Sequence, residues 1–125
     1  MNIQYRVNSD ITTDELIKVF NSVGWNKDKE VIVKAFKNSY YVLAYSEDEL
    51  VGFGRAISDH FFYTGIYDIV VDPRYQGKGI AKKIMGTLIE EFKDTYFFLT
   101  YTDGNREFYE KCGFKQNDQS MWIPR

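Results

Sequence analysis

The sequence is poor in the residues that make covalent cross-links, metal sites and broad electrostatic attraction. Its 125 residues include one cysteine, Cys112, one histidine, His60, and two prolines. A single cysteine excludes an intramolecular disulfide and a cysteine-cluster metal site, and it is typical of a reducing compartment. The formal net charge of −2 gives no general attraction to nucleic acid or to an anionic membrane surface.

Long hydrophobic runs are missing as well. No window of the chain approaches the length of a membrane span, and residues 1–6 lack the apolar region of a signal peptide. We therefore expect a cytoplasmic protein that has no nucleic-acid or membrane partner. The length predicts one domain over residues 1–125, and the aromatic share of 18% supplies large side chains for its core and for a site.

Apolar periodicity and turn residues predict the order of helices and strands. The clearest helix start is a capping box, in which Glu15 follows Thr12 by three residues and Leu16, Phe20 and Val23 continue at helical spacing. The predicted strands are 5–7, 40–45, 50–57, 64–71, 96–101 and one or two within 114–123, and the predicted helices are 12–24, 28–38, 79–92 and 105–112. The order β-α-α-β-β-β-α-β-α-β indicates an α/β protein with a mixed sheet and helices on its faces.

The junction between a strand and a helix at residues 70–81 is the most informative segment. The apolar strand ends before Pro73, which cannot donate to a sheet ladder, and Gly77 and Gly79 lead into the next helix. Unpaired backbone N–H groups and the positive end of the helix dipole converge at such a junction. The segment therefore predicts a phosphate-binding loop, with a simple tight turn as the alternative.

Glycine spacing separates the known kinds of phosphate loop. The nucleoside-triphosphate loop ends in Gly-Lys-Ser/Thr after four intervening residues, and this ending is absent. The dinucleotide fingerprint places a third glycine where this sequence has Lys82, and it opens a βαβ unit instead of following a hairpin. Neither pattern describes this chain.

Two separated motifs resemble those of the GCN5-related N-acetyltransferase (GNAT) superfamily. The run Gln76-Gly77-Lys78-Gly79-Ile80-Ala81 resembles its acyl-coenzyme A loop, and Asn105 with residues 108–114, Phe-Tyr-Glu-Lys-Cys-Gly-Phe, resembles its second hallmark. Residues 23–25, 54–60, 67–77 and 121–125 are similar to a branch that includes plant plastid enzymes described as serotonin or lysine N-acetyltransferases. The resemblance implies a mixed, mostly antiparallel sheet of six or seven strands flanked by about four helices.

The resemblance also implies that acetyl-CoA is the donor and that no metal takes part. The pyrophosphate would lie on the N–H groups of residues 77–82. The preceding strand would splay from the next one, so that the pantetheine arm pairs with its backbone. Asn105 would contact the pantetheine or cap the helix that follows it. The residues expected to contact acetyl-CoA are Ile69, Val70, Val71, Gln76, Gly77, Lys78, Gly79, Ile80, Ala81, Lys82, Asn105, Phe108 and Tyr109.

Acetyl transfer also needs groups that move protons. An alkylamine with a pKa of ~10.4 is only about 0.04% neutral at pH 7, so a carboxylate, or water bound to one, should accept a proton. Asp68 is the first candidate, with a structural hydrogen-bond acceptor as its alternative role, and His60 and Asp59 are the other candidate bases. Tyr109 matches the position at which many superfamily members protonate the leaving thiolate; otherwise it is a core tyrosine. Cys112 is expected to be an inert buried thiol.

We expect direct transfer, in a ternary complex, to the primary amine of a small molecule. A protein lysine as acceptor, or a non-catalytic acyl-CoA-binding module, are the alternatives. An aromatic wall around the site would favour arylalkylamines, and the candidates for it, which could instead be core or a dimer surface, are Tyr40, Tyr41, Phe61, Phe62 and Tyr63. Exposed strands near Phe61 and the C-terminus predict a homodimer.

Overall fold

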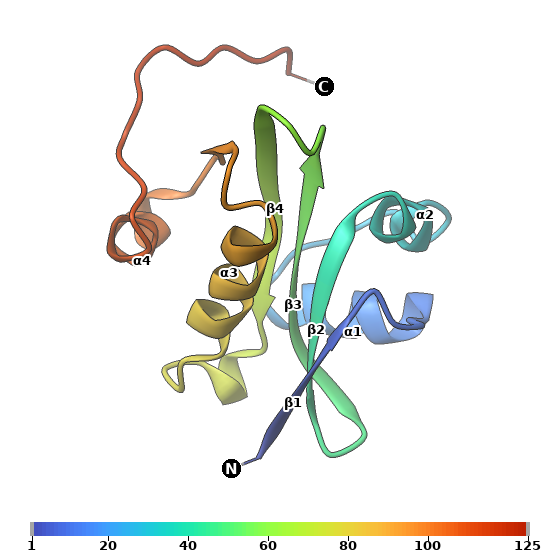
Figure 1. Ribbon diagram of the computed structural model, residues 1–125. Coiled ribbons are helices and arrows are strands. Elements are labelled where there is room, and N and C mark those ends of the chain that lie inside the picture. Colours follow the sequence, from blue (N-terminus) through green and yellow to red (C-terminus); the bar gives the residue numbers. More distant parts are fainter. Residues whose placement is uncertain (1, 125) are drawn as a thin grey trace.

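The computed structural model describes residues 2–124, and Met1 and Arg125 lie outside the described part of the chain (Figure 1). This part contains five strands, four α-helices and two single turns of 3-10 helix, η1 and η2. In chain order the elements are β1 (Ile3–Val7), α1 (Thr13–Ser22), α2 (Ile32–Lys37), β2 (Tyr40–Ser46), β3 (Glu49–Ser58), β4 (Tyr63–Val71), η1 (Pro73–Tyr75), α3 (Ile80–Glu91), β5 (Tyr96–Phe98), η2 (Asp103–Asn105) and α4 (Arg106–Lys111).

The strands form one sheet in the order β1-β2-β3-β4-β5, which is also their order in the chain. The pairs from β1 to β4 are antiparallel, whereas β5 pairs with β4 in parallel. A parallel neighbour requires a crossover, and α3 provides it. The mixed, mostly antiparallel sheet predicted from the sequence is confirmed.

Helices cover both faces of the sheet (Figure 1). Alternate residues of β2 point to opposite faces, as strand geometry requires: Tyr41 and Leu43 pack with α1 and α2, and Val42 and Ala44 pack with α3. On the first face, the rings of Phe20, Phe36 and Phe53 form the centre of the core. The core is therefore divided by the sheet into two layers.

Several element boundaries differ from the prediction. The segment 114–124 forms no strand, so the described sheet has five strands instead of six or seven. Six consecutive polar residues at 115–120 explain this, because they offer neither the alternation nor the β-branched side chains of a strand. The second helix begins at Ile32 because the Asp28 carboxylate accepts the N–H of Glu30 at 2.9 Å and holds a turn there.

The first helix begins as predicted. Thr12 accepts the N–H of Glu15 at 3.2 Å, and the Glu15 carboxylate accepts the N–H of Thr12, which completes the capping box. Within residues 2–124, no helix is long and apolar enough to cross a membrane.

The sheet opens between β4 and β5. Pairing between these strands covers three positions and ends at Gly65 opposite Phe98, although β4 continues to Val71. The outer edge of residues 66–71 therefore lacks a neighbouring strand. This is the splay that the resemblance implied, and it leaves backbone N–H and C=O groups available beside the predicted phosphate loop.

A register shift in β4 adjoins this opening. The pairing of β3 with β4 is irregular between Phe53 and Arg55, and Asp68 has a left-handed backbone, with φ of 54°. The neighbouring Gly54 lacks a side chain where Ile69 and α3 approach closely: a Cβ atom there would lie 2.7 Å from Cγ2 of Ile84. Bulges of this kind re-aim side chains, and this one lies in the part of β4 that has no strand on its outer side.

Candidate functional site

The loop that leads into α3 is a cradle of unpaired backbone donors. Gly77 and Gly79 have φ of 77° and 84°, a conformation that glycine adopts without strain. The N–H groups of residues 77–82 donate no hydrogen bond to any atom of residues 2–124, because the first bond of the helix is donated by Lys83 to the carbonyl of Gly79. Six unpaired donors at the positive end of a twelve-residue helix favour an anionic group.

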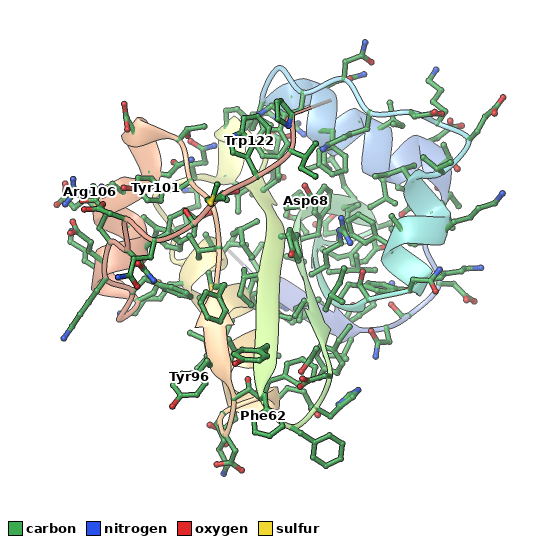
Figure 2. The ribbon with its side chains drawn as sticks, turned by 90° about the horizontal axis from the view of Figure 1, so that it is seen from above. Phe62, Asp68, Tyr96, Tyr101, Arg106 and Trp122 are labelled. Atoms are coloured by element: carbon green, nitrogen blue, oxygen red, sulfur yellow. The ribbon has the colours of Figure 1, made fainter. Side chains whose placement is uncertain are left out.

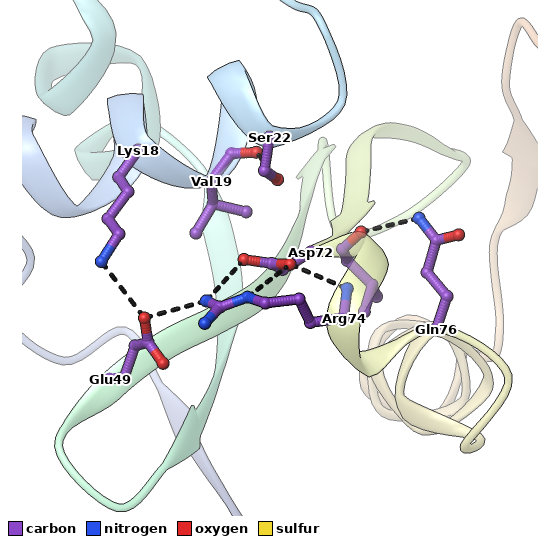
Figure 3. Close-up of polar contacts among 8 residues, drawn as sticks. Lys18, Val19, Ser22, Glu49, Asp72, Arg74 and Gln76 are labelled. Carbon is purple, nitrogen blue, oxygen red and sulfur yellow. Dashed lines mark hydrogen bonds and ion pairs between the residues drawn. The ribbon is translucent and has the colours of Figure 1, made fainter.

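Polar contacts fix the start of this loop (Figure 3). Asp72, which is buried, accepts two hydrogen bonds from the Arg74 side chain and one from its backbone N–H, at 2.9–3.2 Å. Arg74 also donates to Glu49 at 2.9 Å, and Glu49 pairs with Lys18 of α1 at 3.2 Å. The hydrogen bonds from Arg74 hold the pKa of Asp72 below its ordinary value.

Gln76 belongs to the same support. Its side-chain amide donates to the carbonyl of Val71 at 2.9 Å and so ties the loop back to the end of β4 (Figure 3). This contact joins the open strand edge to the cradle. The side chain of Gln76 therefore shapes the loop, in addition to lining the cavity next to it.

A first cavity of about 430 Å³ lies between the open edge of β4, the cradle and α4. Its lining residues are Ile69, Val71, Tyr75, Gln76, Gly77, Gly79, Ile80, Ala81, Lys82, Asn105, Phe108, Tyr109, Lys111 and Cys112. Eleven of the thirteen residues expected to contact acetyl-CoA are in this set. The structure thus brings together two motifs, residues 76–81 and 105–114, that are separated in the sequence.

The two exceptions have simple geometric reasons. Val70 alternates with Ile69 and Val71, so its side chain lies in the core layer beneath α1 and α2, and only its backbone can face the cavity. Lys78 is exposed and does not line the cavity. Tyr75, Lys111 and Cys112 also line it, although the sequence did not place them at acetyl-CoA. Each is a direct neighbour of a predicted motif residue, so proximity along the chain was the signal that could have found them.

A second cavity of about 290 Å³ adjoins the first. It is lined by Trp25, Lys27, Ile66, Tyr67, Asp68, Ile69, Thr100, Tyr101, Thr102, Asn105 and Tyr109. Ile69, Asn105 and Tyr109 line both cavities, so these three side chains form the boundary between them. A molecule in one cavity would meet a molecule in the other beside the Tyr109 phenol.

Tyr109 is held at this boundary by aromatic contacts. Its ring centroid lies 5.2 Å from that of Phe108 and 6.2 Å from that of Phe114. Burial raises the pKa of the Tyr109 phenol, with smaller contributions from Cys112 and Asp68. The phenol is therefore protonated at neutral pH and can act as a hydrogen-bond donor.

Asn105 also lies at the boundary. It occupies the N-cap position of α4, but its side chain makes no capping bond; its amide donates to the Thr102 hydroxyl at 3.1 Å. The predicted alternative of a capping asparagine is wrong. Its carbonyl oxygen remains available to a molecule in either cavity.

Asp68 lies on β4, away from Phe62 and Tyr96 at the other end of the sheet (Figure 2). Its Oδ2 atom accepts a hydrogen bond from Nε of Arg55 at 2.7 Å, and its Oδ1 atom lies 3.7 Å from Nζ of Lys27. The first contact has hydrogen-bond length and the second does not. One carboxylate oxygen is thus fixed by a hydrogen bond, whereas the other has only the longer contact with Lys27; Asp68 is also a lining residue of the second cavity.

The other two candidate bases lie elsewhere. Asp59 and His60 are in the loop between β3 and β4, and neither lines either cavity. The Asp59 carboxylate accepts the backbone N–H groups of residues 61–63 at 2.7–3.0 Å, and these bonds lower its pKa. The His60 ring packs 5.5 Å from that of Phe92.

The predicted aromatic wall is not at the site. Tyr41 is in the core and Tyr40 packs on Phe92, with ring centroids 5.4 Å apart. The remaining candidates are exposed and belong to a surface, here called the aromatic edge, that is formed by Phe61, Phe62, Tyr63, Tyr96 and Phe98. Trp25, Tyr67 and Tyr101 supply the aromatic lining of the second cavity instead.

The remaining polar chemistry of the site is limited. Burial raises the pKa of the Cys112 thiol, which lines the first cavity, so a thiolate is disfavoured at neutral pH. Among residues 2–124 there is no cluster of three His, Cys, Asp or Glu side chains that could hold a metal ion.

Comparisons with known proteins agree with this geometry. Residues 11–114 match the sequence profile of the Acetyltransferase (GNAT) family. The chain is 32% identical over 131 residues to an uncharacterized N-acetyltransferase, ycf52, of Pyropia yezoensis, and the match covers 94% of this chain and 75% of that protein. It is 30% identical over 135 residues to histone acetyltransferase TAP1 of Glycine max, and here the match covers 92% of this chain but 58% of that protein.

A solved structure gives the same result for the fold. A GNAT-family acetyltransferase from Streptococcus pneumoniae matches this chain with a TM-score of 0.85 and 26% identity over 99% of both chains.

Proposed function

The chain belongs to the GNAT family and is an N-acetyltransferase, and on that premise we propose that it moves the acetyl group of acetyl-CoA directly to the primary amine of a small molecule. The observation that carries the proposal is the pair of adjoining cavities, one beside the donor cradle and one beside Asp68, that meet at Tyr109. Two cavities with a common boundary allow both substrates to be bound at once. A covalent enzyme intermediate is then unnecessary.

The residues around the first cavity fit acetyl-CoA. The unpaired N–H groups of residues 77–82 suit the pyrophosphate, and the open edge of β4 offers backbone partners to the amide groups of the pantetheine arm. An N–H group of residues 69–71 would polarise the thioester carbonyl. A donor aimed at a developing oxyanion contributes roughly 3 kcal/mol in other enzymes.

Proton movements are assigned to two side chains. The free amine attacks the carbonyl carbon of the thioester, and Asp68 receives the amine's proton directly or through water by its Oδ1 atom. Tyr109 donates a proton to the departing sulfur of coenzyme A. The products are an N-acetylated amine and coenzyme A with a free thiol.

The direct experiment is a thiol-release assay with acetyl-CoA and a panel of amines. We expect release of coenzyme A that depends on the acceptor, together with one equivalent of acetylated amine by mass spectrometry. Binding of acetyl-CoA without release in the presence of any acceptor would instead identify a non-catalytic acyl-CoA-binding module. The name of the soybean relative supports a lysine side chain of a protein as a second candidate acceptor, so histone-tail peptides belong in the panel.

Replacing Asp68 with asparagine tests the proposed base. Asparagine tolerates the left-handed backbone at this position and can still accept the Arg55 hydrogen bond, so the fold should persist. Because general bases contribute typically 10²- to 10⁴-fold, we expect kcat/KM at neutral pH to fall about a hundredfold. Steady-state kinetics measures this change and a thermal melt checks the fold; unchanged kinetics would return Asp68 to a structural role.

We also propose that the protein is a homodimer that buries the aromatic edge. Phe61, Phe62 and Tyr96 are 79%, 65% and 70% exposed, which is unusual for a cluster of large apolar side chains on a free surface. Sedimentation equilibrium should give twice the chain mass for the unmodified protein. It should give the single mass for a variant carrying Phe62→Ser and Tyr96→Ser. A monomer at every concentration in the unmodified protein would be the contrary result.

A further inference from the structure

The charged groups at the second cavity and directly behind it carry one more positive than negative charge. Asp68 is the one carboxylate among its described lining residues, and Lys27 is the one cation. Arg55, directly behind Asp68, pairs with it at 2.7 Å and is itself largely buried. The charge of Asp68 is thereby offset by Arg55, and the charge of Lys27 remains as a surplus that faces the cavity.

The two cations differ in how firmly they are held. Arg55 donates to Asp68 and to the Ser39 hydroxyl at 2.7 and 2.9 Å, and its guanidinium lies between the rings of Phe36 and Tyr67. Lys27 lies 3.7 Å from Asp68, beyond hydrogen-bond length, and its side chain is 37% exposed. Its ammonium also lies 5.3 and 5.4 Å from the ring centroids of Trp25 and Phe20, but within residues 2–124 it donates no side-chain hydrogen bond comparable to those of Arg55. Because its stem is flexible, Lys27 can move away from Asp68 when another partner enters.

A bare alkylammonium ion is poorly suited to this cavity. It would take the place of Lys27 beside Asp68 and add a second positive charge next to an ammonium that has lost its partner. An acceptor that carries an acidic group in addition to its amine can pair with both charged residues. Its ammonium pairs with Asp68, and its acidic group pairs with Lys27. Charge-assisted hydrogen bonds of this kind are stronger than neutral ones.

From this arrangement we propose that the acceptor is a small amine that also carries a carboxylate, an amino acid with an apolar or aromatic side chain, with Lys27 as the residue that selects for the acid. This inference rests on the proposed function. The rings of Trp25, Tyr67 and Tyr101 line the space left for the side chain, and the volume of about 290 Å³ is large enough for one amino acid.

The transfer balances with no additional reactant. The amine nitrogen forms the new bond to the acetyl carbon while the carbon–sulfur bond of the thioester breaks. The proton lost by the nitrogen passes to Asp68 or its water, and the sulfur leaves with the proton of Tyr109. Lys27 exchanges no proton; its ammonium stays paired with the carboxylate throughout, so it is a specificity-determining residue.

The test uses pairs of acceptors that differ only in the carboxylate. Phenylalanine is compared with phenethylamine, and tyrosine with tyramine. The analogue of phenylalanine with a phosphonate in place of the carboxylate shows whether another acidic group is also accepted. With the full chain we expect kcat/KM to be about tenfold or more higher for the acid of each pair, because losing a hydrogen bond to a charged group costs that order of affinity.

Lys27→Gln should remove this preference selectively. We expect kcat/KM for phenylalanine to fall about tenfold or more. The value for phenethylamine should rise or hold, because a bare amine no longer has to displace an ammonium from Asp68. Lys29→Gln is the matched control, because Lys29 is on the same loop but lines neither cavity. The control should keep the preference of the unmodified protein.

Three outcomes would overturn the proposal. Equal or faster reaction of the decarboxylated partners shows that the acid is not selected, and the proposed transferase function then stands without it. If Lys27→Gln keeps the preference for the acid, Lys27 does not determine specificity. If histone-tail peptides react efficiently and amino acids do not, the acceptor is a protein lysine. Acetyl-CoA binding without thiol release in the presence of any acceptor is a failure of the proposed function itself.

Discussion

Replacing Tyr109 with phenylalanine is expected to lower kcat by about a hundredfold and to leave the affinity for acetyl-CoA nearly unchanged. The phenol lies at the boundary of both cavities, where the thiolate would leave, so its loss removes the proposed proton donor. The ring of the new residue keeps the contacts with Phe108 and Phe114. Single-turnover thiol release and a calorimetric titration with acetyl-CoA separate the two effects.

The pH dependence sharpens this test. Burial raises the pKa of Tyr109 above its ordinary value of 10.0, so the phenol stays protonated from about pH 6 to pH 9. The rise of the rate over this window then comes from deprotonation of the amine, which the variant shares. We expect the ratio of the two rates to be constant across the window. An unchanged kcat, or a loss confined to one end of the pH range, would exclude Tyr109 as the acid.

Replacing Gly79 with alanine is expected to weaken acetyl-CoA binding about tenfold or more. Gly79 has φ of 84°, and a left-handed backbone costs a residue with a Cβ atom roughly 1–2 kcal/mol. The least costly relief is to turn the peptide groups on either side, which are the donors of the cradle. The dissociation constant from calorimetry measures the effect.

Gly86→Ala is the matched control for this experiment. Gly86 lies on the same helix, α3, in open space and without a positive φ, so the substitution should raise helix stability by about 0.5–1 kcal/mol and leave binding unchanged. If both variants bind acetyl-CoA equally well, the conformation of Gly79 does not position the cradle. If both lose binding, the loss comes from α3 as a whole.

The lining of the first cavity could be predicted because its signals are local. Gly77 and Gly79 indicate backbone conformations that few other residues adopt. The short motif around Tyr109 predicts the helix that faces them. Strand alternation also separates Val70 from Ile69 and Val71, although the sequence prediction placed all three at the donor. The element order up to β5 followed equally from apolar periodicity and turns.

The lining of the second cavity was beyond local signals. Lys27 comes from the loop between α1 and α2, and no pattern in the sequence shows that it meets Asp68, which is forty-one residues away. The left-handed backbone of Asp68 has no signature either, because the surrounding run of residues 64–71 predicts a continuous extended strand. The aromatic residues at 61–63 form a dense local cluster that was a candidate for the wall of the site, but they are exposed and line neither cavity.

The opening between β4 and β5 would give the proposed acetyl donor, acetyl-CoA, a structural role as well as a chemical one. The backbone of residues 66–71 has a strand on one side only, and the open side is where the pantetheine arm would pair. In that case a substrate serves as the sixth strand of an unfinished sheet. Each turnover would then form a short stretch of β-sheet pairing and break it again.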